Sequence, residues 1–178
     1  MKAKYKSHKS FSGIYFLVSL LLSASLITSC GGDSSENKTT TDSQTVEKTN
    51  PGGLTDWQIE NGFGPVKKKL NLGPIDKKLS EEGQKIFDIK CITCHKLDER
   101  YTGPAQRDVL QRISPEFFMN MVINPDENIE KHPKTKKLLA EYMNKMTNQN
   151  VTLKDARALL EYFRVLDEEL KQNNQTNQ

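Results

Sequence analysis

Cys91-Ile92-Thr93-Cys94-His95 is the most informative run of the chain, because C-x-x-C-H is the spacing at which haem is covalently attached. Two thiols about one helical turn apart can form thioethers with the two vinyl groups of a haem, and the imidazole that follows can reach the iron. A redox-active C-x-x-C pair is one alternative, but no β-α-β pattern surrounds the run. A zinc site is another, and it would need His95 together with the distant His132. The run therefore predicts one covalent haem c, bound by Cys91 and Cys94, with His95 as an iron ligand.

The first 29 residues carry the pattern of an export signal. Four lysines precede an apolar run that extends from Ile14 to Leu22 and on to Ile27. The run is short and interrupted by serines, so it does not suit a permanent membrane span. It ends in Leu26-Ile27-Thr28-Ser29-Cys30, which resembles the lipobox of bacterial lipoproteins. That resemblance implies cleavage before Cys30 and a lipid on its thiol. The alternative is an ordinary export signal that leaves a free thiol.

Cysteine use and charge limit the remaining possibilities. The three cysteines are all accounted for, one by lipid and two by haem, so none is left for a disulfide. The chain has a formal charge of +3, and loss of the four leader lysines takes it to about −1. The basicity therefore belongs to the export signal. No aromatic-interleaved basic patch follows it, and we expect no nucleic-acid partner.

Composition divides the processed chain into four parts. Residues 30–53 are polar and nearly devoid of apolar side chains, which predicts a disordered tether. Residues 54–79 are punctuated by glycine and proline, which predicts an irregular arm that packs on the haem domain. Residues 80–171 have the size of one small domain. Residues 172–178 are polar and predict a disordered tail.

Helical patterns, and no convincing strand, run through the domain. Ser80 and the two glutamates after it predict the start of a helix that leads into the C-x-x-C-H run. Further helices are expected over residues 105–112, 115–123 and 133–143. The last helix begins at Thr152, whose spacing from Asp155 resembles a capping box, and its apolar residues recur every 3.6 positions. The sequence predicts an all-α fold.

This layout resembles the class I (monohaem) cytochromes c over roughly residues 80–170. In that family a helix precedes the haem motif, Gly-Pro follows it, and a methionine lies shortly before a C-terminal helix that crosses the first. Gly83 and Phe87 match the crossing positions of the first helix, and Tyr162 matches the aromatic residue of the last. Pro104 matches the proline whose carbonyl accepts a hydrogen bond from the haem histidine. The resemblance implies a class I cytochrome c fold around one covalent haem.

Four methionines of the processed chain compete for the second axial position of the iron. Met119 and Met121 lie in an apolar helix, where methionine usually fills a core. Met146 precedes the last helix much as the family's ligand does, so the resemblance implies Met146 as the sixth ligand, with Met143 as the alternative. Thr147 replaces the proline that usually follows the ligand in the family. That departure predicts a looser ligand loop.

His132 is the remaining histidine of the processed chain, and a surface imidazole at a helix start is the expectation for it. With histidine and methionine on its two sides, the iron would have no open position for a substrate, and the thioether would favour the ferrous state. The resemblance therefore implies an electron carrier and not an enzyme. If Met146 does not bind, the alternative is a gas sensor or a peroxidase-like enzyme.

The expected setting combines these inferences. The protein would be a monomer, anchored by its lipid on the periplasmic side of the cell envelope, and would pass electrons from a respiratory donor to a terminal reductase or oxidase. The stretch from Glu60 onward also looks like lipoprotein cytochromes of denitrifying Gram-negative bacteria, of the kind associated with nitrous oxide reduction.

Overall fold

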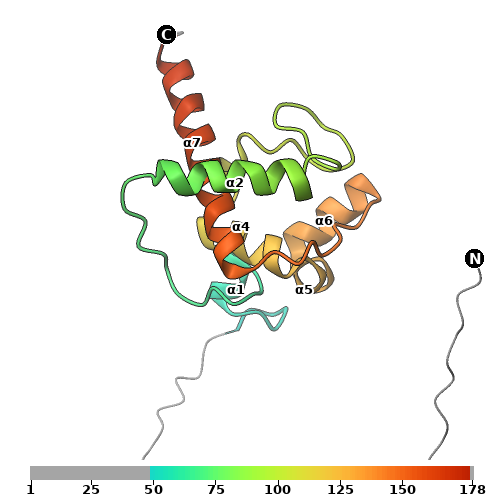
Figure 1. Ribbon diagram of the computed structural model, residues 1–178. Helices are drawn as coiled ribbons and strands as arrows, with labels where there is room; N and C mark the ends of the chain where they lie inside the picture. The colour runs from blue at the N-terminus through green and yellow to red at the C-terminus, as the bar shows by residue number, and fades with distance from the viewer. Residues whose placement is uncertain (1–48, 177–178) are drawn as a thin grey trace, which may run out of the picture. The chain divides into compact units, whose positions relative to one another are not determined.

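Residues 49–176 are the part of the chain that the computed structural model describes. The expected export signal, the expected lipid-bearing Cys30 and the tether up to residue 48 lie outside the described residues. Within residues 49–176 there are seven helices and no strand, apart from an isolated bridge between Thr49 and Thr55. The all-α prediction is confirmed for this part of the chain. The helices, shown in Figure 1, are α1 (Asp56–Asn61), α2 (Lys77–Lys90), α3 (Val109–Arg112), α4 (Pro115–Ile123), α5 (Pro125–Lys131), α6 (Pro133–Tyr142) and α7 (Leu153–Thr176).

The helices α4, α7 and α2 each begin after a side chain that accepts a hydrogen bond from a backbone amide of the first turn. The Ser114 hydroxyl accepts from the Phe117 amide at 3.0 Å and begins α4 where the sequence predicts it. Thr152 and Asp155 form the predicted reciprocal capping box before α7, with both bonds at 3.1 Å. The predicted start of α2 at Ser80 was wrong. Asp76 caps the helix, and its side chain accepts from the Leu79 amide at 3.0 Å. The helix therefore begins three residues before the predicted Ser80.

Four further features differ from the sequence predictions. Helix α5 was not expected, because Pro125 was interpreted as a stop although proline is also favoured in the first turn of a helix. Helix α7 continues to Thr176, so the predicted disordered tail from residue 172 was wrong as far as residue 176. Its polar residues are exposed but are compatible with a helix.

Residues 49–53, assigned to the tether, form a turn in which the Asn50 side chain accepts from the Gly52 and Leu54 amides. Helix α3 covers four residues instead of the expected eight.

Helices α2 and α7 cross in the centre of the domain (Figure 1). A Cβ atom at Gly83 would lie 2.1 Å from the carbonyl oxygen of Ala158, so the two backbones touch here and glycine is required. One turn later the ring of Phe87 packs against Tyr162 and Phe163, with centroid separations of 5.9 and 5.6 Å. The expected roles of Gly83, Phe87 and Tyr162 in the crossing are therefore confirmed. The crossing fixes the end of α2, from which the C-x-x-C-H run follows.

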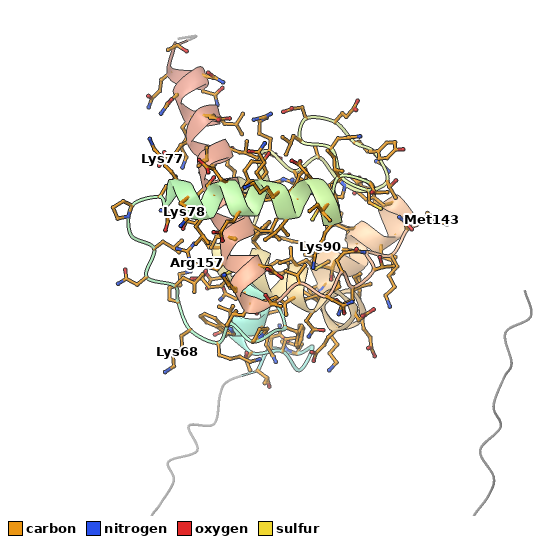
Figure 2. All side chains as sticks on the ribbon, viewed as in Figure 1. Lys68, Lys77, Lys78, Lys90, Met143 and Arg157 are labelled. Atoms are coloured by element: carbon orange, nitrogen blue, oxygen red, sulfur yellow. The ribbon has the colours of Figure 1, made fainter. Side chains whose placement is uncertain are left out.

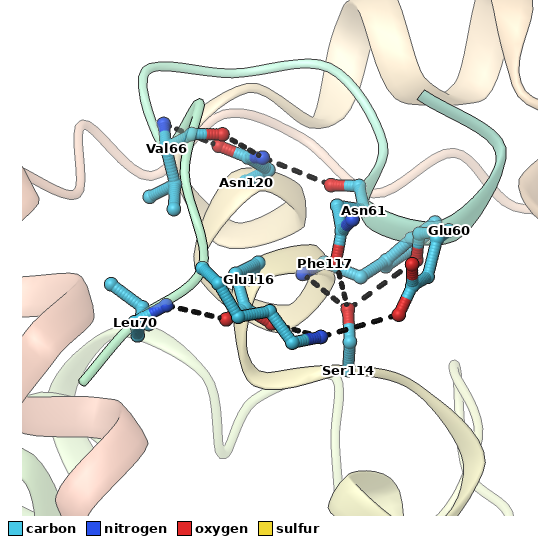
Figure 3. A network of polar contacts seen from close by, with 9 residues as sticks. Glu60, Asn61, Val66, Leu70, Ser114, Glu116, Phe117 and Asn120 are labelled. Carbon is cyan, nitrogen blue, oxygen red and sulfur yellow. Dashed lines mark hydrogen bonds and ion pairs between the residues drawn. The ribbon is translucent and has the colours of Figure 1, made fainter. Parts of the chain in front are cut away.

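Residues 77–79, predicted to belong to the arm, are the first turn of α2, so the arm is residues 54–76. It is irregular apart from α1, and side chains of α4 hydrogen-bond to its backbone. Asn120 accepts from the Val66 amide at 2.9 Å and donates to the carbonyls of Asn61 (2.9 Å) and Val66 (3.0 Å), as Figure 3 shows. Glu116 accepts from the Leu70 amide at 2.7 Å. These contacts give a segment without regular structure the backbone partners that burial demands.

The arm has further partners at Phe63 and at its C-terminal end. Asn128 of α5 pairs with both backbone groups of Phe63, at 2.9 and 2.6 Å. Near α2, the buried carboxylate of Glu161 accepts from the Asp76 amide at 3.1 Å, and Arg164 donates to the Gly73 carbonyl at 2.7 Å. No helix among residues 49–176 has the length and apolar character needed to span a membrane.

Candidate haem-binding site

The C-x-x-C-H run forms a tight turn at the C-terminus of α2. Cys91 is the C-cap, and its carbonyl accepts from the amides of Cys94 (3.1 Å) and His95 (2.9 Å). Cys91 is half-buried and Cys94 is exposed, and both lie on the same cavity as His95. A reactive C-x-x-C pair needs a thiol of lowered pKa, but burial raises the pKa of Cys91 to about 11. The turn thus has the arrangement needed to hold a haem, and Cys91 does not have the lowered pKa of a reactive thiol.

The cavity has a volume of about 380 Å³, within the range of roughly 300–1,000 Å³ typical of cofactor sites. Helices α3, α4, α6 and α7 supply its apolar walls, through Val109, Phe118, Val122, Leu138, Leu139 and Phe163. Two thiols and an imidazole on a mostly apolar cavity are the donor set that a covalently bound haem requires. The residues present therefore fit haem.

His95 is held in one orientation. Its Nδ1 lies 3.2 Å from the carbonyl oxygen of Pro104, the contact that the resemblance implies. Gly103 leaves room for the ring, since a Cβ there would lie 2.4 Å from His95 Cε1. Burial lowers the pKa of His95, and the hydrogen bond to Pro104 works against that effect. The ring is therefore neutral near pH 7, with Nε2 left free to bind a metal.

The methionines occupy different environments. Met146 lies on the loop between α6 and α7 and lines the cavity. Met143 adopts a left-handed backbone conformation at the end of α6, is 87 % exposed and projects from the domain (Figure 2). Met119 is buried in the core, whereas Met121 lines the cavity. The assignment of Met121 to core filling therefore missed a cavity residue.

The loop that carries Met146 is tied to the end of α2. Lys90, directly before Cys91, donates to the carbonyls of Gln149 and Asn150, both at 3.2 Å. Lys145 forms an ion pair with Asp126 of α5 at 2.6 Å. No sequence pattern indicated either contact, because each joins residues far apart in the chain.

His132 is not a surface residue, so that expectation was wrong. It is 2 % exposed, and its ring packs on Phe117 with centroids 4.8 Å apart. Nε2 donates to the Ile59 carbonyl at 3.0 Å, and Nδ1 accepts from the Lys134 amide at 3.2 Å. The partner of Nε2 is an arm residue distant in the chain, which a helix-start pattern cannot reveal. Because both ring nitrogens have backbone partners, His132 is not available as a metal ligand.

A model of the cytochrome c family matches residues 80–167. A solved structure of a member of that family is also similar to this chain, and the match covers nearly the whole length of that structure. The structure of the cytochrome c from Rhodothermus marinus is 42 % identical, with a TM-score of 0.60, and the match covers 97 % of that chain and 63 % of this one. The chain belongs to the cytochrome c family. Members of this family bind haem c covalently and transfer electrons to and from redox proteins.

Two engineered forms of the Rhodothermus marinus cytochrome c are also similar to this cytochrome. One is 41 % identical with a TM-score of 0.59, and the other, which carries a carbene intermediate, is 41 % identical with a TM-score of 0.57. Each match covers 62 % of this chain and 96 % of the other. Among curated proteins, none matches the chain. The predicted class I cytochrome c fold with one covalent haem is confirmed.

Proposed function

We propose that this cytochrome is a tethered carrier of single electrons, with Cys91 and Cys94 holding the haem and with His95 and Met146 as its axial ligands. The observation that carries the proposal is that one apolar cavity is lined by the C-x-x-C-H turn and by Met146. When bound, the haem supplies an iron centre that accepts and releases one electron. Pro104 orients the His95 ring, and the apolar walls exclude water and so favour the less charged ferrous state.

The choice of Met146 over Met143 rests on their surroundings. Met146 reaches the cavity, while the side chain of Met143 is 87 % exposed. With both axial positions filled by protein side chains, no position is open for a substrate, which favours a carrier over the alternative gas sensor or peroxidase-like enzyme. The cytochrome is therefore proposed not to be an enzyme.

Partner proteins would approach the surface around Cys94. This thiol is exposed, and so are two apolar side chains that precede it in the chain, Ile89 in the last turn of α2 (77 %) and Ile92 in the attachment turn (40 %). Exposed apolar side chains close in sequence to the attachment cysteines suit the brief, small interfaces of redox encounters. The proposed partners are a respiratory donor and a terminal reductase or oxidase, and the cytochrome would meet them as a monomer.

The tether is proposed from the leader and its lipobox-like end. A lipid on Cys30 would hold the domain at a membrane on the periplasmic side of the cell envelope. Anchoring raises the local concentration of the carrier near membrane-bound partners. An association with nitrous oxide reduction rests on the resemblance of the stretch from Glu60 onward.

Visible spectra of the purified holoprotein test the carrier proposal. The oxidised form should show the far-red band of methionine bound to ferric haem, and carbon monoxide should leave the reduced spectrum unchanged. Met146→Ala should abolish that band, admit carbon monoxide and lower the reduction potential, whereas the matched variant Met143→Ala should behave as wild type. Carbon monoxide binding by the wild-type protein would favour the sensor, and loss of the band in the Met143 variant would transfer the ligand role to that residue.

A further inference from the structure

Gln106 brings a second donor to the carbonyl that orients the haem histidine. Its Nε2 donates to the Pro104 oxygen at 2.8 Å, while His95 Nδ1 lies 3.2 Å from the same oxygen. The amide nitrogen is also 3.1 Å from His95 Nδ1. One carbonyl therefore faces two neighbouring N–H groups, and the glutamine makes the shorter contact.

The chemistry of a bound histidine fixes the roles of these atoms. When Nε2 of His95 binds iron, Nδ1 must carry the proton and act as a donor. The Gln106 amide nitrogen is a donor as well, so the two nitrogens cannot bond to each other. They must share the Pro104 oxygen. A carbonyl that already accepts a strong bond from Gln106 is a weaker acceptor for the ring N–H.

The backbone of Gln106 is held in place, so the contact is not that of a loose surface side chain. Its amide donates to the carbonyls of Lys96 (3.1 Å) and Leu97 (3.0 Å), which belong to the loop after the C-x-x-C-H turn. The residue is half-buried and lines the cavity beside His95. Its side-chain amide is thus positioned by the same loop that positions the haem histidine.

We propose that Gln106 is a positioning residue that raises the reduction potential of the haem by competing with His95 for the Pro104 carbonyl. A strong bond at Nδ1 gives the imidazole more anionic character and makes it a better donor to ferric iron. Weakening that bond favours the ferrous state. The inference rests on the proposed ligation of the iron by His95.

Gln106→Leu tests this by removing the competing donor at nearly constant size. The reduction equilibrium against a reference couple should shift about threefold toward the ferric state, which is a fall of about 30 mV for one electron. Gln106→Glu should lower the potential further, because a carboxylate cannot donate to Pro104 and can accept from the ring N–H. Gln111→Leu is the matched control, since Gln111 bonds to Asp167 on the exposed surface, and its potential should equal that of wild type.

A second measurement separates tuning from a merely structural role. In the reduced, diamagnetic protein the His95 Nδ1–H resonance should move downfield in Gln106→Leu, since the ring bond to Pro104 strengthens. The proposal is overturned if the reduction potential and the Nδ1–H resonance of Gln106→Leu equal those of the Gln111→Leu control, even if Gln106→Leu is less stable. If Gln106→Leu does not retain haem, the same two measurements on Gln106→Glu decide the matter. If the potential and the resonance do not change but every variant keeps covalent haem and the far-red band, the proposal for Gln106 fails and the carrier proposal is unaffected.

Discussion

Asn120→Leu should release the arm before the rest of the domain unfolds. The side chain is fully buried and satisfies three backbone groups, the Val66 amide and the carbonyls of Val66 and Asn61 (Figure 3). Leucine has a similar volume but leaves all three groups without partners. Stranding a buried polar group costs about 1–3 kcal/mol. Because water can reach the arm as it moves, the low end applies, and the loss should be about 3 kcal/mol in total.

Urea unfolding followed by two probes gives the measurement. Trp57, the one tryptophan of the chain, lies in α1 of the arm, so its fluorescence reports on the arm, and far-UV circular dichroism reports on the helices. In wild type the two transitions should coincide. In Asn120→Leu the fluorescence change should come first, because the arm becomes the least stable part. Asn71→Leu, on the exposed arm surface, is the control. A loss below about 1 kcal/mol, with coincident transitions, would contradict the inference that these three bonds hold the arm.

Further predictions concern the helix crossing, the buried histidine and the attachment site. Gly83→Ala should destabilise the domain by about 1–3 kcal/mol in a urea titration, because the new methyl group would meet the Ala158 carbonyl; an unchanged midpoint would mean that the helices separate freely. Burial lowers the pKa of His132 from 6.5, so the folded protein binds a proton less readily than the unfolded chain. Stability should therefore fall as pH drops below 6.5, by at most about 1.4 kcal/mol per pH unit, and His132→Gln should lack this part of the slope. Cys94→Ser should retain haem less firmly under acid–acetone extraction, and full retention would contradict two-point attachment.

Features encoded within a few residues were accessible from the sequence. The C-x-x-C-H run, the Ser114 cap and the Thr152–Asp155 capping box each depend on neighbours in the chain, and the structure has the turn, α4 and α7 where those patterns lie. Predictions from local patterns were wrong where one residue type is compatible with two different structures. Pro125 can stop one helix or start the next, and it does both.

Features that depend on distant partners were not accessible. The hydrogen bond of the buried His132 ring requires Ile59 of the arm, more than 70 positions away, and the roles of Asn120 and Asn128 require Val66 and Phe63. The sequence pattern of a helix does not show whether an asparagine side chain is exposed or hydrogen-bonds to the backbone of another segment. Gln106 was missed for the same reason, since its importance lies in the position of its amide beside His95.

The ligand loop shows how such distant contacts can offset a local departure. Thr147 stands where the family resemblance implies proline, which predicts a looser loop around Met146. Lys90 binds the far end of that loop through the Gln149 and Asn150 carbonyls, and it does so from the residue next to Cys91. The residue before the attachment turn is thus bonded to the loop that carries the proposed sulfur ligand, so the separation between the two sides of the haem site depends less on the rigidity of the loop itself.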